Sequence, residues 1–351
     1  MKWEFDWITD WDTIWGQQFQ EKWLQWIDES ENAHVFYHPE IVKAWVETYM
    51  THRKIEPLFC VASLGSTVVF FPLIIWKMNW KNAFCKKIVP AGYSDFDYHD
   101  PLFIRSESSN FETFWNRLFI ELEKFKNIKG CDFIEIGGIR DFPKKSPFLF
   151  FKDDICPLRS LEEFNQNSDL FLPSLKSSLR GDIKRQIRRL EEQGDVELVV
   201  YESQNEKEAI LRLNELLKIH TIRWPNAYKA PNFHQNILTN GLGSNTVHFS
   251  VLFLSGLPIS YHLGFLFNNR MYYYMPAIAV EYQKNSPGKL HLYYLNKIAI
   301  ESGCKFFDHL RGEENYKDGW TTEIIQLYTT VVFSNTFFSR CKQIVLNLKN
   351  R

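Results

Sequence analysis

The sequence predicts a mixed α/β fold with two similar halves in tandem, arranged around a shared cleft. The chain has 351 residues, whereas one domain usually holds roughly 100–200. The same order of hairpin, third strand, loop, long helix and final strand also occurs twice along the chain. We therefore assign an N-terminal domain to residues 1–150 and a C-terminal domain to residues 151–351.

The composition is typical of a globular protein, with 45% hydrophobic and 24% charged residues. Forty-one Lys and Arg residues nearly balance 42 Asp and Glu residues, which argues against a dedicated nucleic-acid-binding protein. Acidic residues occupy the start of the chain, where a signal peptide would be apolar, and the longest apolar run, Thr67–Trp76, is too short to span a membrane. The six cysteines form no C-x-x-C pair. We expect a cytoplasmic protein without a metal and without stable membrane insertion.

Aromatic residues recur at spacings of three and four near the N-terminus. They are Trp3, Trp7, Trp11, Trp15, Phe19, Trp23 and Trp26. This spacing places most of them on one face of a helix. We interpret that face as one that docks on the protein's own core, and attachment to a membrane surface is the alternative.

In the first half, apolar runs separated by turn residues predict three strands, at Leu58–Ser63, Thr67–Trp76 and Lys86–Val89. An amphipathic helix is expected over Phe111–Phe125, and a strand over Asp132–Ile136 follows it. A linker rich in Pro, Lys, Asp and Asn is expected over residues 141–168.

The second half repeats this order. Strands are predicted at Val247–Leu254, Ile259–Phe267 and Met271–Ala277, a helix up to Ser302, and a last strand over Lys305–Leu310. The final strands of the halves can be superimposed, with Gly130 to Glu135 matching Gly303 to Asp308 at three identical positions of six. Together these features favour an internal duplication.

Ser286, Pro287 and Gly288 precede a helix that is predicted over Lys289–Ser302. Ser favours the N-cap and Pro the first helical position, while Gly lets a ligand approach the backbone. Free amide groups and the partial positive charge of such a helix end suit a phosphate or a diphosphate. An ordinary well-capped helix is the alternative.

A cluster of polar residues follows the last predicted strand, from Asp308 to Lys317. Acyl transfer to an amine requires a proton acceptor, stabilisation of an oxyanion and a proton donor for the leaving group. Carboxylates, Lys and Tyr316 could supply these functions. A salt bridge between Asp308 and Arg311 that closes a loop at Gly312 is the alternative for those two residues.

A basic amphipathic helix is expected over residues 179–190. Arg180, Lys184 and Arg188 lie one turn apart on one of its faces, and such a row could hold the phosphates of a nucleotide or of coenzyme A. A solvated helix face is the other interpretation. His262, within a predicted strand, could act as a base or simply be a core histidine.

The order of strands, loop, helix and strand resembles the core of the GNAT acyltransferase superfamily. The segment from Gln283 to Gly288 resembles its Q/R-x-x-G-x-G/A motif for coenzyme A, with Ser286 in place of the first Gly. Ser-Pro-Gly followed by the Asp308–Lys317 segment, and the segment from Leu216 to Trp224, are similar to CelD-like acetyltransferases of polysaccharide gene clusters. The segment from Lys317 to Trp320 resembles a motif of the FemAB-type transferases, which are tandem GNAT proteins.

These resemblances imply an N-acyltransferase that moves an acyl group from acyl-CoA to the amine of an amino sugar, nucleotide-linked, in polysaccharide biosynthesis. The C-terminal domain would be catalytic, and a homodimer is possible. The expected catalytic residues are Asp308, Tyr316 and Lys317. The residues expected to bind acyl-CoA are Gln283, Ser286, Gly288, Lys289 and Asn315. The residues expected to bind the acceptor are Asp95, Asp97, Arg180, Lys184, His220, Arg223, Trp224, His262, Arg311 and Glu313.

Two other functions stay open at this point. One is a FemAB-like transferase that uses aminoacyl-tRNA, against which the balanced net charge counts. The other is a non-catalytic pair of GNAT-like halves that serves as a scaffold, which the departure at Ser286 would allow.

Overall fold

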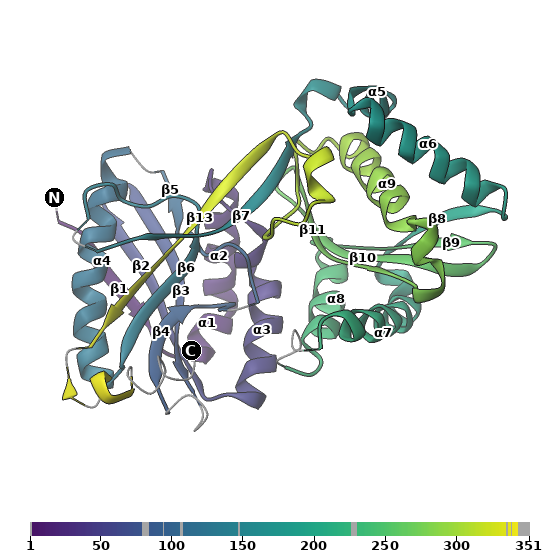
Figure 1. Ribbon diagram of the computed structural model, residues 1–351. Coiled ribbons are helices and arrows are strands. Elements are labelled where there is room, and N and C mark those ends of the chain that lie inside the picture. Colours follow the sequence, from purple (N-terminus) through teal and green to yellow (C-terminus); the bar gives the residue numbers. More distant parts are fainter. Residues whose placement is uncertain are drawn as a thin grey trace. The chain divides into compact units, whose positions relative to one another are not determined.

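The computed structural model describes residues 2–78, 84–93, 95–105, 108–146, 148–225, 230–334, 336–337 and 339–342. These residues form two compact α/β units (Figure 1). The first unit extends to Asp154 and resumes at Gln326, and the second comprises Ile155–Ile325. A single boundary after residue 150 was expected, but the residues from Gln326 onward belong with the first unit because they pair with one of its strands.

The first unit contains a mixed sheet with the strand order β1-β2-β3-β4-β6-β13. Its strands are β1 (Glu4–Ile8), β2 (Ile55–Leu64), β3 (Thr67–Lys77), β4 (Lys86–Pro90), β5 (Leu102–Ile104), β6 (Phe133–Ile139) and β13 (Glu323–Phe333). Its main helices are α1 (Trp11–Trp15), α2 (Gln17–Glu29), α3 (Pro39–His52) and α4 (Ser108–Lys129). Strands β4 and β6 are parallel, and the neighbouring pairs are antiparallel.

The tryptophan-rich N-terminus is not one helix. Trp7 lies in strand β1 and Trp3 precedes it, so the single helical stripe predicted for the first residues is wrong at these two positions. Trp23, on α2, is fully buried, and its ring lies 5.0 Å from that of Phe70 on β3. Its Nε1 donates to the carbonyl of Tyr37 at 2.9 Å. At Trp23 the aromatic face therefore docks on the sheet of its own unit.

The second unit has the strand order β7-β12-β11-β10-β9-β8. The strands are β7 (Phe151–Ser160), β8 (Val196–Tyr201), β9 (Val247–Leu254), β10 (Leu257–Phe267), β11 (Arg270–Ile278) and β12 (Phe306–Asp308). The helices are α5 (Phe171–Ser174), α6 (Ser177–Glu191), α7 (Glu206–Arg223), α8 (Phe233–Gly243) and α9 (Pro287–Glu301). Strand β7 lies within the predicted linker, which is therefore in part a structural strand paired with β12.

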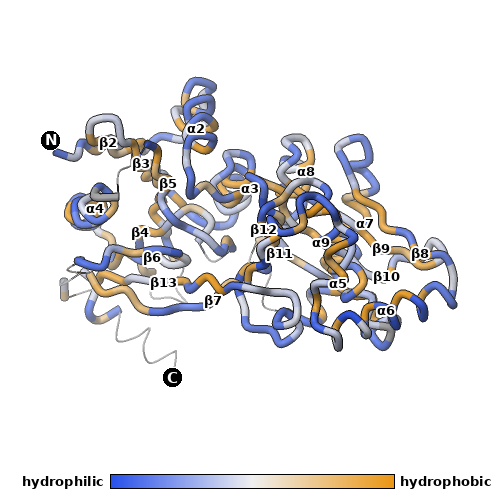
Figure 2. Tube along the Cα trace, turned by 90° about the horizontal axis from the view of Figure 1, so that it is seen from above, coloured by the Kyte–Doolittle hydropathy of each residue, from blue (hydrophilic) through white to orange (hydrophobic). Residues whose placement is uncertain are grey.

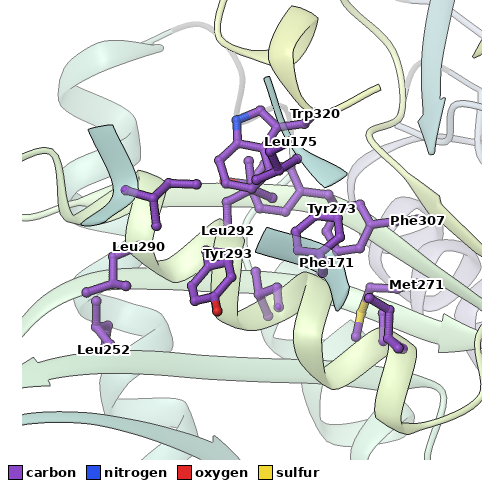
Figure 3. Packing of buried hydrophobic residues seen from close by; sticks show 14 of the residues in the cluster. Phe171, Leu175, Leu252, Met271, Tyr273, Leu290, Leu292, Tyr293, Phe307 and Trp320 are labelled. Carbon is purple, nitrogen blue, oxygen red and sulfur yellow. The ribbon is translucent and has the colours of Figure 1, made fainter. Parts of the chain in front are cut away.

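Helices cover both faces of the second sheet, with α7 and α8 on one face and α6 and α9 on the other (Figure 1). The core between the sheet and α9 contains Met271, Tyr273, Phe307 and Leu292, with Trp320 packed beside them (Figure 3). Helix α6 alternates between hydrophilic and hydrophobic residues along its length (Figure 2), as expected for a helix with one face on this core.

Strand β11 contains a bulge that positions the site. Leu263 pairs with Met275 and Phe265 with Tyr272, so two residues of β11 lie opposite Gly264 alone. A Cβ atom at Gly264 would lie 2.3 Å from the carbonyl oxygen of Tyr272, and glycine is therefore needed there. Beyond the bulge β11 continues to Ile278, whereas its parallel pairing with β12 covers only Arg270–Tyr272.

No helix in the described part of the chain combines the length and the hydropathy needed to cross a bilayer. Most of the basic segment after residue 334 lies outside the described residues.

Candidate functional site

The candidate site lies where β11 and β12 cease to pair. The last residue pair is Tyr272 with Asp308, so Tyr273 and His309 are the first residues beyond it. Both are buried, and their ring centroids lie 5.8 Å apart. Phe307 packs next to both rings. The end of strand pairing thus coincides with a compact group of aromatic side chains on the α9 face of the sheet.

Helix α9 begins close to the end of β11. Ser286 occupies the N-cap with φ of 48°, in the left-handed region, and Pro287 is the first helical residue, as expected. The Ser286 side chain makes no capping hydrogen bond within the described chain, while its carbonyl oxygen accepts from the amide of Lys289 at 3.1 Å. Gln283 is exposed in the short helix Val280–Asn285, which precedes α9. The helix end therefore keeps the partial positive charge that favours an anion.

Gly288, in the first turn of α9, packs against the end of β11. A Cβ atom at this position would lie 2.8 Å from Cδ1 of Ile278. A side chain at position 288 would therefore have to displace the Ile278 side chain from the first turn of the helix.

An ion pair joins α6 to the start of α9. The Lys289 ammonium contacts the carboxylate of Asp182, which also accepts from Arg185 at 3.0 Å. The hydrogen bond from Lys289 is the main reason that the pKa of Asp182 is lowered. The start of the basic helix is thereby held beside the candidate anion site.

The predicted basic row is only partly available for a ligand. Lys184 is exposed, and the Arg180 guanidinium donates to the carbonyl of Pro173 at 2.9 Å. Arg188 lies 3.7 Å from Glu192.

Asp308 is fully buried and fixed by two donors. Its Oδ2 accepts from Arg270 Nη1 at 2.8 Å, and its Oδ1 accepts from the amide of Leu310 at 2.9 Å. Sequence reasoning proposed Arg311 as the salt-bridge partner and overlooked Arg270, which lies 38 positions away along the chain. Asp308 therefore links β12 to β11 and shapes the turn that follows.

Lys317 is also buried, and its ammonium is surrounded by oxygen atoms. It donates to the carbonyls of Arg311 at 3.0 Å, Gly312 at 3.3 Å and Leu310 at 3.4 Å. The carboxylate of Glu314 lies 2.8 Å from the ammonium. Lys317 thus stabilises the conformation of the loop after β12.

Tyr316 lies next to this ion pair and is 41% exposed. Desolvation raises the pKa of its phenol, and the charge of Glu314 raises it further, while Arg223 opposes the rise. The phenol is therefore protonated at neutral pH. The charge of Arg223, at the end of α7, thus reaches Tyr316.

The other predicted residues at the end of α7 lie in the same region. Trp224 is half-exposed, and the Arg223 guanidinium lies 5.7 Å from the centre of its indole. Burial lowers the pKa of His220, and Arg223 lowers it further. Arg223 therefore interacts with His220, with Trp224 and, through its charge, with Tyr316.

Four other predicted residues lie in loops. Glu313 and Asn315 are exposed on the loop after β12. Asp95 lies in the first unit, where its Oδ2 accepts from Trp45 Nε1 at 2.9 Å, and Asp97 is two residues further along the same loop. Within its own unit Asp95 tethers helix α3, which is a structural role.

His262 belongs to a buried polar row on the α9 face of the sheet. Its ring stacks on Tyr273 with centroids 4.7 Å apart and planes 12° apart. Nearby His291, on α9, contacts the hydroxyls of Ser250 at 2.9 Å and Ser260 at 3.0 Å. Burial lowers the pKa of His291 to about 3 and holds that of His262 well below its usual range.

Sequence reasoning assigned no role to Tyr273 and His309, whereas Glu314 was part of the predicted polar cluster from Asp308 to Lys317. Three consecutive tyrosines at positions 272–274 interrupt the alternation of the strand, which is the one signal that could have indicated the bulge. In the described residues, no group of three or more His, Cys, Asp or Glu side chains is arranged to hold a metal ion.

Comparison with known proteins bears on this site directly. Residues 177–318 match the family model of the acetyltransferase (GNAT) domain. This range begins at α6 and ends within the loop that carries Lys317, so it contains α9, the bulge and the residues after β12. No curated protein matches the sequence significantly.

Solved structures with the same fold extend over both units. The crystal structure of FemX matches with a TM-score of 0.63 at 12% identity, covering 99% of this chain and 100% of that one. A protein of unknown function from Bacteroides thetaiotaomicron has a TM-score of 0.55 at 9% identity, covering 89% and 97%. A tandem GNAT protein from the clavulanic acid biosynthesis pathway has a TM-score of 0.51 at 9% identity, covering 95% and 99%. The chain therefore has a tandem GNAT fold.

Proposed function

We propose that this chain, which has a GNAT domain at residues 177–318 and a tandem GNAT fold, is an N-acyltransferase that uses acyl-CoA. The acceptor is the amine of an amino sugar linked to a nucleotide diphosphate, in polysaccharide biosynthesis. One observation carries the proposal. Strands β11 and β12 stop pairing at Tyr272 and Asp308, and helix α9 begins at Pro287, shortly after β11 ends.

The donor site is assigned to the start of α9. The amides of its first turn and the helix dipole favour the diphosphate of coenzyme A. Gly288 keeps this turn close to β11, which leads back to Tyr273. The thioester would then lie near Tyr273, among the candidate catalytic residues.

The first unit supports this choice of working half. There the loop after β4 binds to its own β6, since the amide of His99 donates to the carbonyl of Gly138 at 3.0 Å and His99 Nδ1 lies 2.9 Å from the carbonyl oxygen of Gly137. Arg140 also pairs with Asp100 at 2.6 Å. In the first unit, the end of β6 corresponds to the candidate site, and its backbone groups bind residues of the same unit.

The reaction is direct attack by the neutral amine on the thioester carbonyl. The new C–N bond forms as the C–S bond breaks, and the thiolate takes the proton of the Tyr316 phenol. The phenol regains a proton from the nitrogen that has become the amide, so that protons balance. Burial and the negative charge of Glu314 raise the pKa of the phenol, so Tyr316 is protonated before this step.

Lys317 and Asp308 act as positioning residues in this scheme. The ammonium of Lys317 is already hydrogen-bonded to the carbonyls of residues 310–312, and both oxygens of Asp308 accept hydrogen bonds. They fix the loop that carries Tyr316 relative to β11. Direct proton transfer by either group would require these contacts to break.

The acceptor site is assigned to the end of α7. The exposed face of Trp224 can stack on a sugar or a base, and Arg223 can pair with a diphosphate. The similarity of residues 286–317 to CelD-like proteins supports an amino sugar.

A second candidate function is aminoacyl transfer from tRNA. Helix α6 carries Lys184, Arg185, Arg188 and Arg189 as exposed basic residues, and such a face can bind a polynucleotide as well as a single phosphate. This surface is the specific feature that favours the second candidate.

Thermal unfolding in the presence of ligands tests the proposal. Coenzyme A at 100 times its dissociation constant should stabilise the protein by about 2.7 kcal/mol, which raises the melting temperature by several degrees. Deacylated tRNA should have no effect. Stabilisation by tRNA alone would support the second function. No stabilisation by either ligand would favour the non-catalytic scaffold.

Variants at Gly288 locate the donor site. In the double variant Gly288→Ala and Ile278→Val, the smaller side chain at position 278 makes room for the new methyl group. A weaker stabilisation by coenzyme A in this variant would then reflect a direct effect on ligand binding. Gly243→Ala is the control, because a Cβ atom there meets no atom within 4 Å. An unchanged response in the Gly288 variant would remove this helix end from the site.

A further inference from the structure

Two histidines flank Tyr273 on the α9 face of the sheet. His262 stacks on Tyr273 at 4.7 Å, and His309 lies 5.8 Å from the same ring. His262 is fully buried and His309 is 1% exposed. Gly264 leaves room for the His262 ring, since a Cβ atom there would lie 2.3 Å from the Cε1 atom of His262.

The ring nitrogens of these two histidines are not satisfied by the protein. Neither nitrogen of His262 and neither nitrogen of His309 has a hydrogen-bond partner among the described residues. His291, in the same row, shows that the fold can satisfy a buried histidine, because Ser250 and Ser260 each bind one of its nitrogens. Buried polar groups without partners are uncommon in native proteins, and each calls for a ligand, a bound water or a functional role.

Both rings are neutral at physiological pH. Burial lowers the pKa of His309 to about 3, with a further contribution from Lys317, and it holds the pKa of His262 well below its usual range. A neutral imidazole offers one N–H donor and one acceptor nitrogen. The nearby carboxylate of Glu314 is already paired with Lys317. The pair of rings therefore suits a neutral group that both donates and accepts, such as a hydroxyl, rather than an ammonium.

The position of His309 connects it to the chemistry. It follows Asp308 directly and lies near enough to Lys317 to sense its charge, while Tyr273 senses the charges of Tyr316 and Glu314. The thioester that we propose near Tyr273 would place its acyl group beside the two histidines that flank that ring. We infer that the acyl group transferred by this protein carries a hydroxyl, which His309 and His262 bind. The inference rests on the proposed acyl-CoA-dependent function and specifies its donor.

Binding of two matched donors tests the inference. The dissociation constants of 3-hydroxybutyryl-CoA and butyryl-CoA, which differ by one hydroxyl oxygen, are measured by calorimetry with the full chain and without an acceptor. We expect the hydroxylated donor to bind at least about tenfold more tightly. Equal binding of the two donors would overturn the inference and leave the proposed function standing. If the chain binds neither donor nor coenzyme A, the proposed function fails and the inference fails with it.

Variants separate hydrogen bonding from packing. His309→Leu should reduce the preference to less than about threefold, whereas His309→Gln keeps a donor and an acceptor and should retain most of it. His262→Phe, which preserves a ring beside Tyr273, should also reduce the preference. His234→Phe is the control, because His234 is a buried histidine of α8, on the opposite face of the sheet. Melting temperatures confirm that each variant is folded. The same preference in His309→Leu and His309→Gln would contradict the inference.

Discussion

Arg270 Nη1 lies 2.8 Å from Asp308 Oδ2, and this ion pair joins β11 to β12 at the end of their pairing. The first unit contains the equivalent contact, 2.8 Å between Lys87 Nζ and Glu135 Oε2, which joins β4 to β6. The registers correspond, since Arg270 pairs with Phe306 and Lys87 with Phe133, each two residues before the acidic residue. The internal duplication therefore extends to a basic residue on one strand and an acidic residue on the next.

Arg270→Met should destabilise the second unit strongly. Asp308 is fully buried, so loss of its partner leaves a buried carboxylate without a counter-charge, which costs about 3–5 kcal/mol. Denaturant unfolding would measure the change, and the double variant with Asp308→Asn should lose less than the sum of the two single variants. Arg185→Met is the control, because the side chain of Arg185 is 58% exposed and its ion pair contributes at most about 1 kcal/mol. A loss below 1 kcal/mol in Arg270→Met would show that the pair is not structurally important.

Lys317→Met should lower both stability and turnover. The substitution keeps the length of the side chain but removes the donors that hold the carbonyls of residues 310–312, and it leaves Glu314 without its partner. We expect a loss of about 1–3 kcal/mol in unfolding free energy, with a fall in kcat that exceeds any change in KM for the donor. Lys305→Met is the control, since that side chain is 59% exposed and 4.0 Å from Glu162. Normal turnover in Lys317→Met would contradict the positioning role.

Tyr316→Phe should lower kcat by about 100-fold or more while the melting temperature changes little, because only the proton donor is removed. The wild-type protein should show no loss of kcat from this group up to pH 10, since burial and Glu314 raise the pKa of the phenol. Steady-state kinetics across pH would test both statements. Tyr294→Phe, a partly buried tyrosine of α9, is the control. Equal effects of the two substitutions would assign Tyr316 no specific role.

Local patterns in the sequence were sufficient to predict the elements around the site. The predicted strand over Val247–Leu254 has the observed bounds, and the helix predicted from Lys289 to Ser302 runs from Pro287 to Glu301. Apolar runs and the Ser-Pro start determine these elements locally. The family resemblance added the GNAT core, which the match at residues 177–318 confirms.

The sequence could not show which residues meet across strands. Every residue of β9 is buried, so no alternation reveals its faces or its register. Arg270 pairs with Asp308 and Tyr273 bulges opposite Gly264 because of long-range register, which no local pattern encodes. Strand β7 was missed for a related reason, since Lys152, Asp153 and Asp154 make its first half polar and it pairs only with distant segments.

The second unit should lose stability in mild acid. Burial lowers the pKa of His248 to about 4, and that of His234, His291 and His309 to about 3, whereas histidines of the unfolded chain titrate near 6.5. Below pH 6.5 the unfolded chain therefore binds more protons than the folded one, and each such histidine removes up to about 1.4 kcal/mol of stability per pH unit until its folded pKa is reached.

Urea unfolding at pH 7.5 and pH 5.0 would measure this acid sensitivity, and His234→Phe isolates one contribution. Each histidine should lower the unfolding free energy by about 2 kcal/mol over this range, because pH 5.0 is about 1.5 units below the pKa of a histidine in the unfolded chain. In the variant, the difference in unfolding free energy between pH 7.5 and pH 5.0 should be smaller by that amount. An unchanged difference in stability would mean that His234 is protonated in the folded protein at pH 5, contrary to the direction in which burial shifts its pKa.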